Sequence, residues 1–260
     1  MEDGIARDGM KAGDVVVVTG GGGGFGQAFA RRFARAGARL AVWDIDRKAA
    51  EDVVRDIRAE GGEASFIAAD LAAKSDIEAA VSQTLETVGV PYCIVNNAST
   101  YPRASVIDMV PAAWEHTLKV NITAPFLILR AFGPRLIERK RGVVINIASG
   151  RAVEGAVNGA AYACSKAAIL SLTKSLALEW AKHNIRVNAI IPGVSLTTQP
   201  LGGEGVTREE LIERGRKTIP LGRIGYPDDM AGLALFLASA DAAYMTGQGV
   251  AMNGGRVLVP

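Results

Sequence analysis

Short runs of apolar residues, rich in valine and isoleucine, alternate with longer segments of helical periodicity along this chain. DVVVVTG at 14–20 is the first such run, and YCIVNNA at 92–98 and GVVINIAS at 142–149 are later ones. A strand that is apolar on both faces is buried on both faces, as in a parallel sheet covered by helices. The strict alternation therefore predicts an α/β fold, with a doubly wound parallel β-sheet and helices on both of its faces.

The chain of 260 residues shows no internal linker and no repeat. This predicts a single domain over 13–260 after a flexible tail at 1–12. The longest helical patterns cover 114–140 and 160–183. The main polar insertion lies at 195–219, and we interpret it as a lid over a substrate.

Charge and composition argue against several classes of protein. The chain has 29 basic and 27 acidic residues without a long run of either sign, which argues against nucleic-acid binding. No window reaches about 18 uninterrupted apolar residues, so no membrane-spanning helix is expected. Two cysteines and two histidines provide neither a disulfide framework nor a metal cluster. We expect a cytoplasmic protein with reduced thiols and no bound metal.

The stretch TGGGGGFG at 19–26 lies between the first predicted strand and the first predicted helix. Glycine loses more conformational entropy on folding than any other residue, so such a run is unfavourable unless the missing side chains are needed. In a parallel α/β sheet this turn binds phosphate on the free N–H groups of the helix that follows. Gly26 would let helix and strand pack closely, and a flexible loop is the alternative interpretation.

Asp44 ends the second predicted strand, about 20 residues beyond the glycine turn, where an acidic residue can accept hydrogen bonds from a ribose. A carboxylate there would repel the 2′-phosphate of NADP by roughly 4 kcal/mol per unit charge at close range. Asp44 therefore favours NAD, although the nearby Arg47 could soften this preference. A helix N-cap and a solvated loop carboxylate are the alternative interpretations of Asp44.

Tyr162 and Lys166 lie four residues apart in a predicted helix and so share one face. A tyrosine with its ordinary pKa is too weak a base near neutrality. A lysine ammonium at about 4 Å contributes roughly 4 kcal/mol at an effective dielectric of about 20. We therefore expect Lys166 to lower the pKa of Tyr162 and to make it a phenolate base.

These motifs stand in one order along the chain. The glycine turn has the spacing G-x-x-x-G-x-G, and Tyr162 and Lys166 form the pattern Y-x-x-x-K. The other landmarks are Asp70-Leu71, NNAS at 96–99, Asn121, Ser149, Pro192-Gly193 and TGQ at 246–248. In this register the chain resembles the classical short-chain dehydrogenase/reductase family from Val15 to Gly255. The resemblance implies a Rossmann-like fold and a homotetramer.

The resemblance also implies catalytic roles for four residues. Tyr162 would take the proton from a substrate hydroxyl, and Lys166 would lower its pKa and hold the ribose of the cofactor. Ser149 would bind the substrate oxygen, and Asn121 would hold a water that links Lys166 to solvent. The implied cofactor-binding residues are Gly20, Gly24, Phe25, Gly26, Asp44, Asp70, Leu71, Asn97, Ala98, Tyr162, Lys166, Pro192, Gly193, Ser195 and Thr197.

The motifs together predict an NAD-dependent oxidoreductase that interconverts a secondary alcohol and a ketone, or an alcohol and an aldehyde, by hydride transfer. Three alternatives stay open. They are an NADPH-dependent reductase of 3-oxoacyl thioesters, a non-catalytic NAD-binding sensor, and a sugar-nucleotide epimerase.

Several further residues border the predicted site. Arg103 and Arg151 follow motifs next to the substrate space, and either a solvated surface or a substrate carboxylate would account for them. Cys164, between the tyrosine and the lysine, is expected to be a small buried residue, and His116 to lie on a helix surface. Asn253 departs from the family pattern, in which aspartate is commoner. Ser99 is a second departure, because the family usually has glycine at this position.

Overall fold

Seven parallel strands form one sheet in this computed structural model, which describes residues 9–197 and 206–257. The strands are β1 (Val15–Thr19), β2 (Arg39–Asp44), β3 (Glu63–Ala68), β4 (Pro91–Asn96), β5 (Gly142–Ile147), β6 (Ile185–Pro192) and β7 (Gly249–Met252). Their spatial order is β3-β2-β1-β4-β5-β6-β7, so the direction of winding reverses between β1 and β4. Ligands of such sheets bind at this reversal, beyond the carboxyl ends of the strands.

The central strands are buried at every position, as the continuous apolar runs predicted. The edge strands β3 and β7 are partly exposed, because each has a neighbour on one side only. The predicted α/β fold with a doubly wound parallel sheet is thus confirmed.

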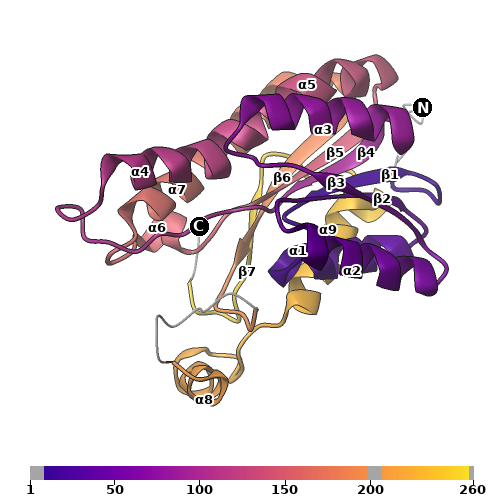
Figure 1. The fold of residues 1–260 in the computed structure, drawn as a ribbon. Coiled ribbons are helices and arrows are strands. Elements are labelled where there is room, and N and C mark those ends of the chain that lie inside the picture. The colour runs from indigo at the N-terminus through magenta and orange to yellow at the C-terminus, as the bar shows by residue number, and fades with distance from the viewer. Residues whose placement is uncertain (1–8, 198–205, 258–260) are drawn as a thin grey trace, which may run out of the picture.

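Helices cover both faces of the sheet (Figure 1). The helices of the described residues are α1 (Gly24–Arg35), α2 (Arg47–Ala59), α3 (Lys74–Thr87), α4 (Pro111–Leu118), α5 (Ala124–Arg139), α6 (Arg151–Glu154), α7 (Ala160–Trp180), α8 (Arg208–Thr218) and α9 (Pro227–Ala238). The helices α1, α2 and α9 pack on one face of the sheet, and α3, α5 and α7 on the other. Short 3-10 turns follow α7 at Ala181–His183 and α9 at Ala240–Ala242.

The single helix predicted over 114–140 is wrong. It is divided into α4, a π-helical turn at Lys119–Thr123, and α5. Pro125 has no N–H, so the carbonyl of Asn121 lacks the donor that a regular helix would place four residues on. The irregular turn contains Asn121, whose buried side chain forms hydrogen bonds with Thr100 and Ser165.

The flexible tail predicted over 1–12 is wrong for residues 9–12, whereas residues 1–8 lie outside the described residues. The N–H of Met10 donates to the carbonyl of Ala238 at 3.0 Å, and the carbonyl of Gly9 accepts from Arg141 at 2.7 Å. Arg141 also forms a bidentate ion pair with Asp14, at 2.7 and 2.8 Å. These contacts close the end of the sheet opposite the glycine turn.

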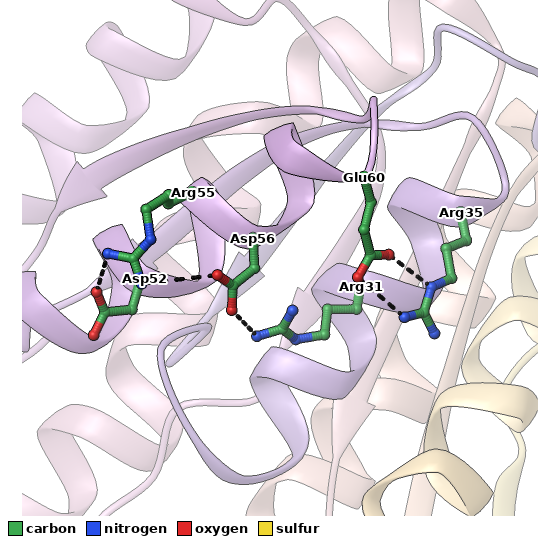
Figure 2. A network of polar contacts seen from close by, with 6 residues as sticks. All are labelled: Arg31, Arg35, Asp52, Arg55, Asp56 and Glu60. Carbon is green, nitrogen blue, oxygen red and sulfur yellow. Dashed lines mark hydrogen bonds and ion pairs between the residues drawn. The ribbon is translucent and has the colours of Figure 1, made fainter.

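Charged side chains join α1 to α2 on the surface (Figure 2). Arg31 pairs with Asp56 at 2.8 Å. Two guanidinium nitrogens of Arg35 donate to the two carboxylate oxygens of Glu60, at 3.0 and 3.3 Å. Arg55 continues the network to Asp52, at 2.6 Å. Exposed pairs of this kind contribute little individually, but they connect the two helices that flank the glycine turn.

Candidate active site

A cavity of about 900 Å³ lies beyond the carboxyl ends of β1, β2, β4, β5 and β6. The turn between β1 and α1 forms its floor, and the end of β2 forms one wall. Residues from the segment after β4, from α6 and from α7 surround the other end. This is the position at which the strand order reverses, as expected for a dinucleotide site.

The glycine turn is an ordered cradle, which rules out the alternative of a flexible loop. Gly20 and Gly24 have φ angles of +62° and +52°, a backbone conformation that favours glycine. A Cβ on Gly26 would lie 1.9 Å from the carbonyl oxygen of Gly20, so helix and strand can pack only with glycine there. Gly23 begins α1 without a side-chain cap, which leaves N–H groups available to a phosphate. The cradle therefore fits a pyrophosphate.

Asp44 is fixed at the cavity wall by two backbone donors. Its carboxylate accepts from Gly22 N–H at 2.8 Å and from Asp46 N–H at 3.0 Å. Asp46, and not Asp44, caps α2 by accepting from Ala49. The N-cap alternative for Asp44 is therefore wrong.

Arg47 does not soften the acidic wall. Its guanidinium pairs with Glu51 at 2.9 Å and lies 5.0 Å from the ring centroid of Phe66. Arg47 is also not among the residues that line the cavity. A ribose at this wall would meet the carboxylate of Asp44 without a neutralising charge from Arg47.

Ser149, Tyr162 and Lys166 line one stretch of the cavity. Ser149 follows β5, and the other two residues lie one helical turn apart on α7. The buried amine of Lys166 donates to the carbonyl of Ile147 at 2.7 Å, and its Nζ lies 5.5 Å from the ring centroid of Tyr162. Tyr162 forms a hydrogen bond with Ser149.

The pKa values of this group differ from the sequence-based expectation. Burial raises the pKa of Tyr162, although the hydrogen bond with Ser149 and the positive charge of Arg151 partly oppose this effect. Burial also lowers the pKa of Lys166, to about 7. The expected lowering of the tyrosine pKa is therefore wrong for the unliganded protein, because removal of both groups from water favours their neutral forms.

Asn121 does not line the cavity, and its side chain is fully engaged. Its side-chain Oδ1 accepts from Thr100 N–H at 2.8 Å. Its side-chain Nδ2 donates to the carbonyl of Thr100 and to the hydroxyl of Ser165. The side chain therefore ties the segment after β4 to α7. The main-chain carbonyl of Asn121, which Pro125 cannot engage, is the atom of this residue best suited to hold a water.

Tyr101 stacks on Tyr162, a contact that the sequence does not reveal. The ring centroids are 4.2 Å apart and the ring planes differ by 17°. The guanidinium carbon of Arg103 lies over the Tyr101 ring, 5.2 Å from its centroid. The sequence places Arg103 near the substrate space, but only the fold brings the two tyrosine rings together.

A family model described as enoyl-(acyl carrier protein) reductase matches residues 21–256. The chain belongs to the classical short-chain dehydrogenase/reductase family. The motifs on which the resemblance rested thus stand in the fold that this family shares.

Three relatives within the short-chain dehydrogenase/reductase family show the range of activities around this chain. The 2-(S)-hydroxypropyl-CoM dehydrogenase 3 of Xanthobacter autotrophicus is 35% identical over 250 residues, which cover 95% of this chain and 97% of the relative. The NAD-dependent glycerol dehydrogenase of Listeria innocua is 34% identical, with 94% of each chain covered. A structure described as an NAD(P)-dependent gluconate 5-dehydrogenase from Beutenbergia cavernae, with NADP bound at low occupancy, has 36% identity and a TM-score of 0.88. That match covers 94% of this chain and 97% of the other. The chain is thus an oxidoreductase of this family, whereas the likeness does not choose between NAD and NADP.

Most of the residues predicted for a short-chain dehydrogenase/reductase site line the cavity, and their individual roles stay predictions. The predicted residues on its wall are Gly20, Gly24, Phe25, Asp44, Asp70, Leu71, Asn97, Ala98, Ser149, Tyr162, Lys166, Pro192, Gly193, Ser195 and Thr197. Gly26 and Asn121 do not line the cavity: Gly26 packs against the Gly20 carbonyl, and Asn121 donates to the hydroxyl of Ser165. His116 is exposed on α4, as expected, and it also lines the cavity.

The sequence gives little sign of the last part of this short-chain dehydrogenase/reductase site. Arg256 and Val257, in the segment after β7, also line the cavity. A single basic residue after a glycine pair is a weak signal in sequence, so this part of the site was missed.

The expectation that Cys164 is buried is wrong, because it faces outward from α7 together with Ala167 and Ser171.

Two properties concern only the described residues. No helix among them combines the length and the apolar character needed to cross a membrane. Within 9–197 and 206–257, no group of three or more histidine, cysteine, aspartate or glutamate side chains is arranged to hold a metal ion.

Proposed function

We propose that this protein is an NAD-dependent dehydrogenase that interconverts a secondary alcohol and a ketone, or an alcohol and an aldehyde. The observation that carries the proposal is the presence of Ser149, Tyr162 and Lys166 in one cavity with the glycine cradle. A sensor or scaffold that only binds NAD would not need the three polar side chains to meet at one point.

The positions of these residues support the following roles. Tyr162 Oη removes the proton from the substrate hydroxyl, and Ser149 Oγ holds the same substrate oxygen next to it. Lys166, held by the carbonyl of Ile147, supports the tyrosine from the buried side. A bound NAD would supply the hydride acceptor for the reaction and would add positive charge to the site. We also propose that a water on the main-chain carbonyl of Asn121 connects Lys166 to solvent.

The preference for NAD rests on Asp44. Its carboxylate lies on the cavity wall and accepts a hydrogen bond from the glycine turn. Arg47 does not neutralise its charge, because Arg47 pairs with Glu51. A 2′-phosphate at this point would bring nearly two further negative charges beside the carboxylate. One relative was solved with NADP bound, so the preference is a property that we propose for this chain alone.

We further propose that residues 195–219 form a lid and that 13–260 act as a single catalytic domain. The proposed lid at 195–219 includes α8, which begins with a capping box between Thr207 and Glu210. Residues 198–205 of the proposed lid lie outside the described residues. By family analogy we propose a homotetramer, which light scattering would test. An NADPH-dependent reductase of 3-oxoacyl thioesters stays the second candidate.

The first test measures binding of NAD(H) and NADP(H) by fluorescence, and then NADH formation over a panel of secondary, aryl and hydroxy-acid alcohols. We expect NAD binding and turnover of at least one alcohol. Tyr162→Phe should keep NAD binding and lose nearly all turnover, and Arg55→Gln on the exposed face of α2 is the matched control. Preference for NADPH, or full activity of Tyr162→Phe, would contradict the proposal.

A further inference from the structure

The charged residues around the cavity are separated by sign. The end that holds Asp44 is acidic, and its one arginine, Arg31, is paired with Asp56 (Figure 2). The end beyond Tyr162 is basic, with Arg103, Arg151 and Arg256 against one carboxylate, that of Glu154. The acidic end suits a ribose, and the basic end lies where the substrate must extend.

Arg151 is close to the reacting group. It lies two residues after Ser149, as the first residue of α6, and its charge lowers the pKa of Tyr162. Its ion pair with Glu154 spans 3.6 Å, and both side chains are more than a third exposed. A pair of this length and exposure is weak, so the guanidinium is available to a ligand.

Arg256 approaches the same end of the cavity from the opposite terminus. Val257 Cγ2 lies 3.5 Å from the position of a Cβ on Gly150, so the segment after β7 packs on the turn that leads to Arg151. Arg256 is half-buried on the cavity wall. In the part of the chain that the structure describes, no hydrogen bond or ion pair engages its side chain. A partly buried guanidinium without a partner is unfavourable unless a ligand supplies the anion.

Two hydrogen bonds of the Asn253 side chain hold the loop that carries Arg256. The amide Nδ2 of Asn253 donates to the carbonyl of Val257 at 2.7 Å, and its Oδ1 accepts from Gly255 N–H at 3.0 Å. The two bonds close the short loop that carries Arg256. Aspartate, which the family pattern has here, could not donate to Val257. The departure from the family pattern therefore gives this loop its shape.

We propose that the substrate of this dehydrogenase carries an anionic group away from its reacting carbon, and that Arg151 and Arg256 bind this group. The proposal rests on the proposed function and adds the chemical class of the substrate. Guanidinium groups bind carboxylate, phosphate and sulfonate through the same charged hydrogen bonds. Arg103, over the Tyr101 ring, also lines the cavity and adds positive charge to it.

The test compares hydroxy acids with their methyl esters, and with hydroxyalkyl phosphates and sulfonates of the same length. We expect the best acid, phosphate or sulfonate to exceed its neutral counterpart in kcat/KM by about 10- to 100-fold, as one charged hydrogen bond gained implies. Arg256→Gln should reduce this ratio by about tenfold or more, mainly through KM. Arg256→Lys should retain part of it, and Arg55→Gln should leave it unchanged.

Asn253→Asp is a second variant, which keeps Arg256 and disturbs only its loop. It should lower the same ratio, and circular dichroism of each variant checks that it is folded. Titration calorimetry with sulfate, phosphate and the hydroxy acids adds a readout that does not depend on turnover. We expect saturable binding to the wild type and weaker binding to Arg256→Gln.

The outcomes separate the two proposals. Anion binding that depends on Arg256 in a protein that turns over no alcohol would support the anion site and contradict the proposed reaction. Turnover of neutral alcohols with no preference for any anion, and no saturable anion binding, would overturn the anion site and leave the proposed reaction in place. If neither turnover nor anion binding is observed, both proposals are wrong.

Discussion

The ring of Tyr101 lies against the ring of Tyr162 at a centroid distance of 4.2 Å, nearly parallel to it. Gly159 makes this possible, because a Cβ at that position would come within 2.7 Å of the Tyr101 ring. The stack covers one face of the proposed base and contributes to its burial. We therefore expect Tyr101 to be a positioning residue, which acts through Tyr162.

Replacement of Tyr101 should change the pH dependence of turnover. Tyr101→Leu removes the stack and lets water reach Tyr162, which lowers the pKa of Tyr162 because burial is the largest cause of its increase. The rise of kcat with pH should therefore move to lower pH. An aromatic stack contributes about 0.5–1.5 kcal/mol, so kcat should also fall about 2- to 10-fold as the base loses its fixed position.

Tyr101→Phe is the control, because it keeps the ring and removes only the hydroxyl, whose electrostatic effect is a smaller cause of the raised pKa of Tyr162 than burial. The other charged or hydrogen-bonding groups that face Tyr162, namely Ser149, Arg151 and Lys166, are the same in both variants. Identical pH profiles of kcat for the wild type and Tyr101→Leu would contradict the positioning role.

Substitution of Asp44 should change the choice of cofactor. Asp44→Asn removes the negative charge but keeps an oxygen that can accept from Gly22. Loss of the repulsion should increase the ratio of NADP to NAD in kcat/KM by about tenfold or more. Arg47→Gln is the control, since Arg47 is engaged by Glu51 away from the cavity. An unchanged ratio in Asp44→Asn would show that another group selects the cofactor.

The buried amine of Lys166 should make stability depend on pH. The unfolded chain keeps this lysine protonated up to its ordinary pKa of 10.5, whereas the folded protein releases the proton near pH 7. Between these values the unfolded state binds more protons, so the free energy of unfolding rises with pH by at most about 1.4 kcal/mol per pH unit. Below about pH 7 both states are protonated, and the cost of burying the ammonium is present in full.

Lys166→Met provides the measurement, because it lacks the titrating group. Urea denaturation from pH 6 to pH 10 should show the wild type gaining stability over this variant between pH 7 and pH 10. Parallel curves for the two proteins would mean that Lys166 keeps its charge when buried.

The ion pair of Arg141 and Asp14 should contribute more to stability than the pairs on the surface. Both side chains are less than a quarter exposed, and Arg141 also lies 4.0 Å from the ring centroid of Tyr92. Arg141→Met leaves the carboxylate of Asp14 without its bidentate partner, which should cost about 3 kcal/mol in the free energy of unfolding.

The control for this prediction is Arg55→Met, in an exposed pair with Asp52 (Figure 2). It should change the free energy of unfolding by less than about 1 kcal/mol. Urea denaturation of both variants at neutral pH gives the comparison. Equal effects would show that partial burial adds nothing to the Arg141 pair.

Local patterns in the sequence were enough to predict the sheet, its helical layers and the residues of the glycine turn. Uninterrupted apolar strands can be stable only when both faces are covered, and glycines between a strand and a helix have few other uses. The spacing of Tyr162 and Lys166 likewise follows from helix geometry alone. The break before α5 was missed, because the effect of Pro125 depends on how far the preceding helix continues.

The sequence by itself determined the fold, the cradle and the pair on α7, because each depends on residues that are close along the chain. Only the tertiary structure decided the electrostatics of the site. The pKa of Tyr162 depends on how completely Tyr101 and the surrounding segments exclude water, and spacing contains no information about burial. The basic end of the cavity is also tertiary, because Arg151 and Arg256 are 105 residues apart along the chain and line one cavity only through long-range packing such as that of Val257 on Gly150.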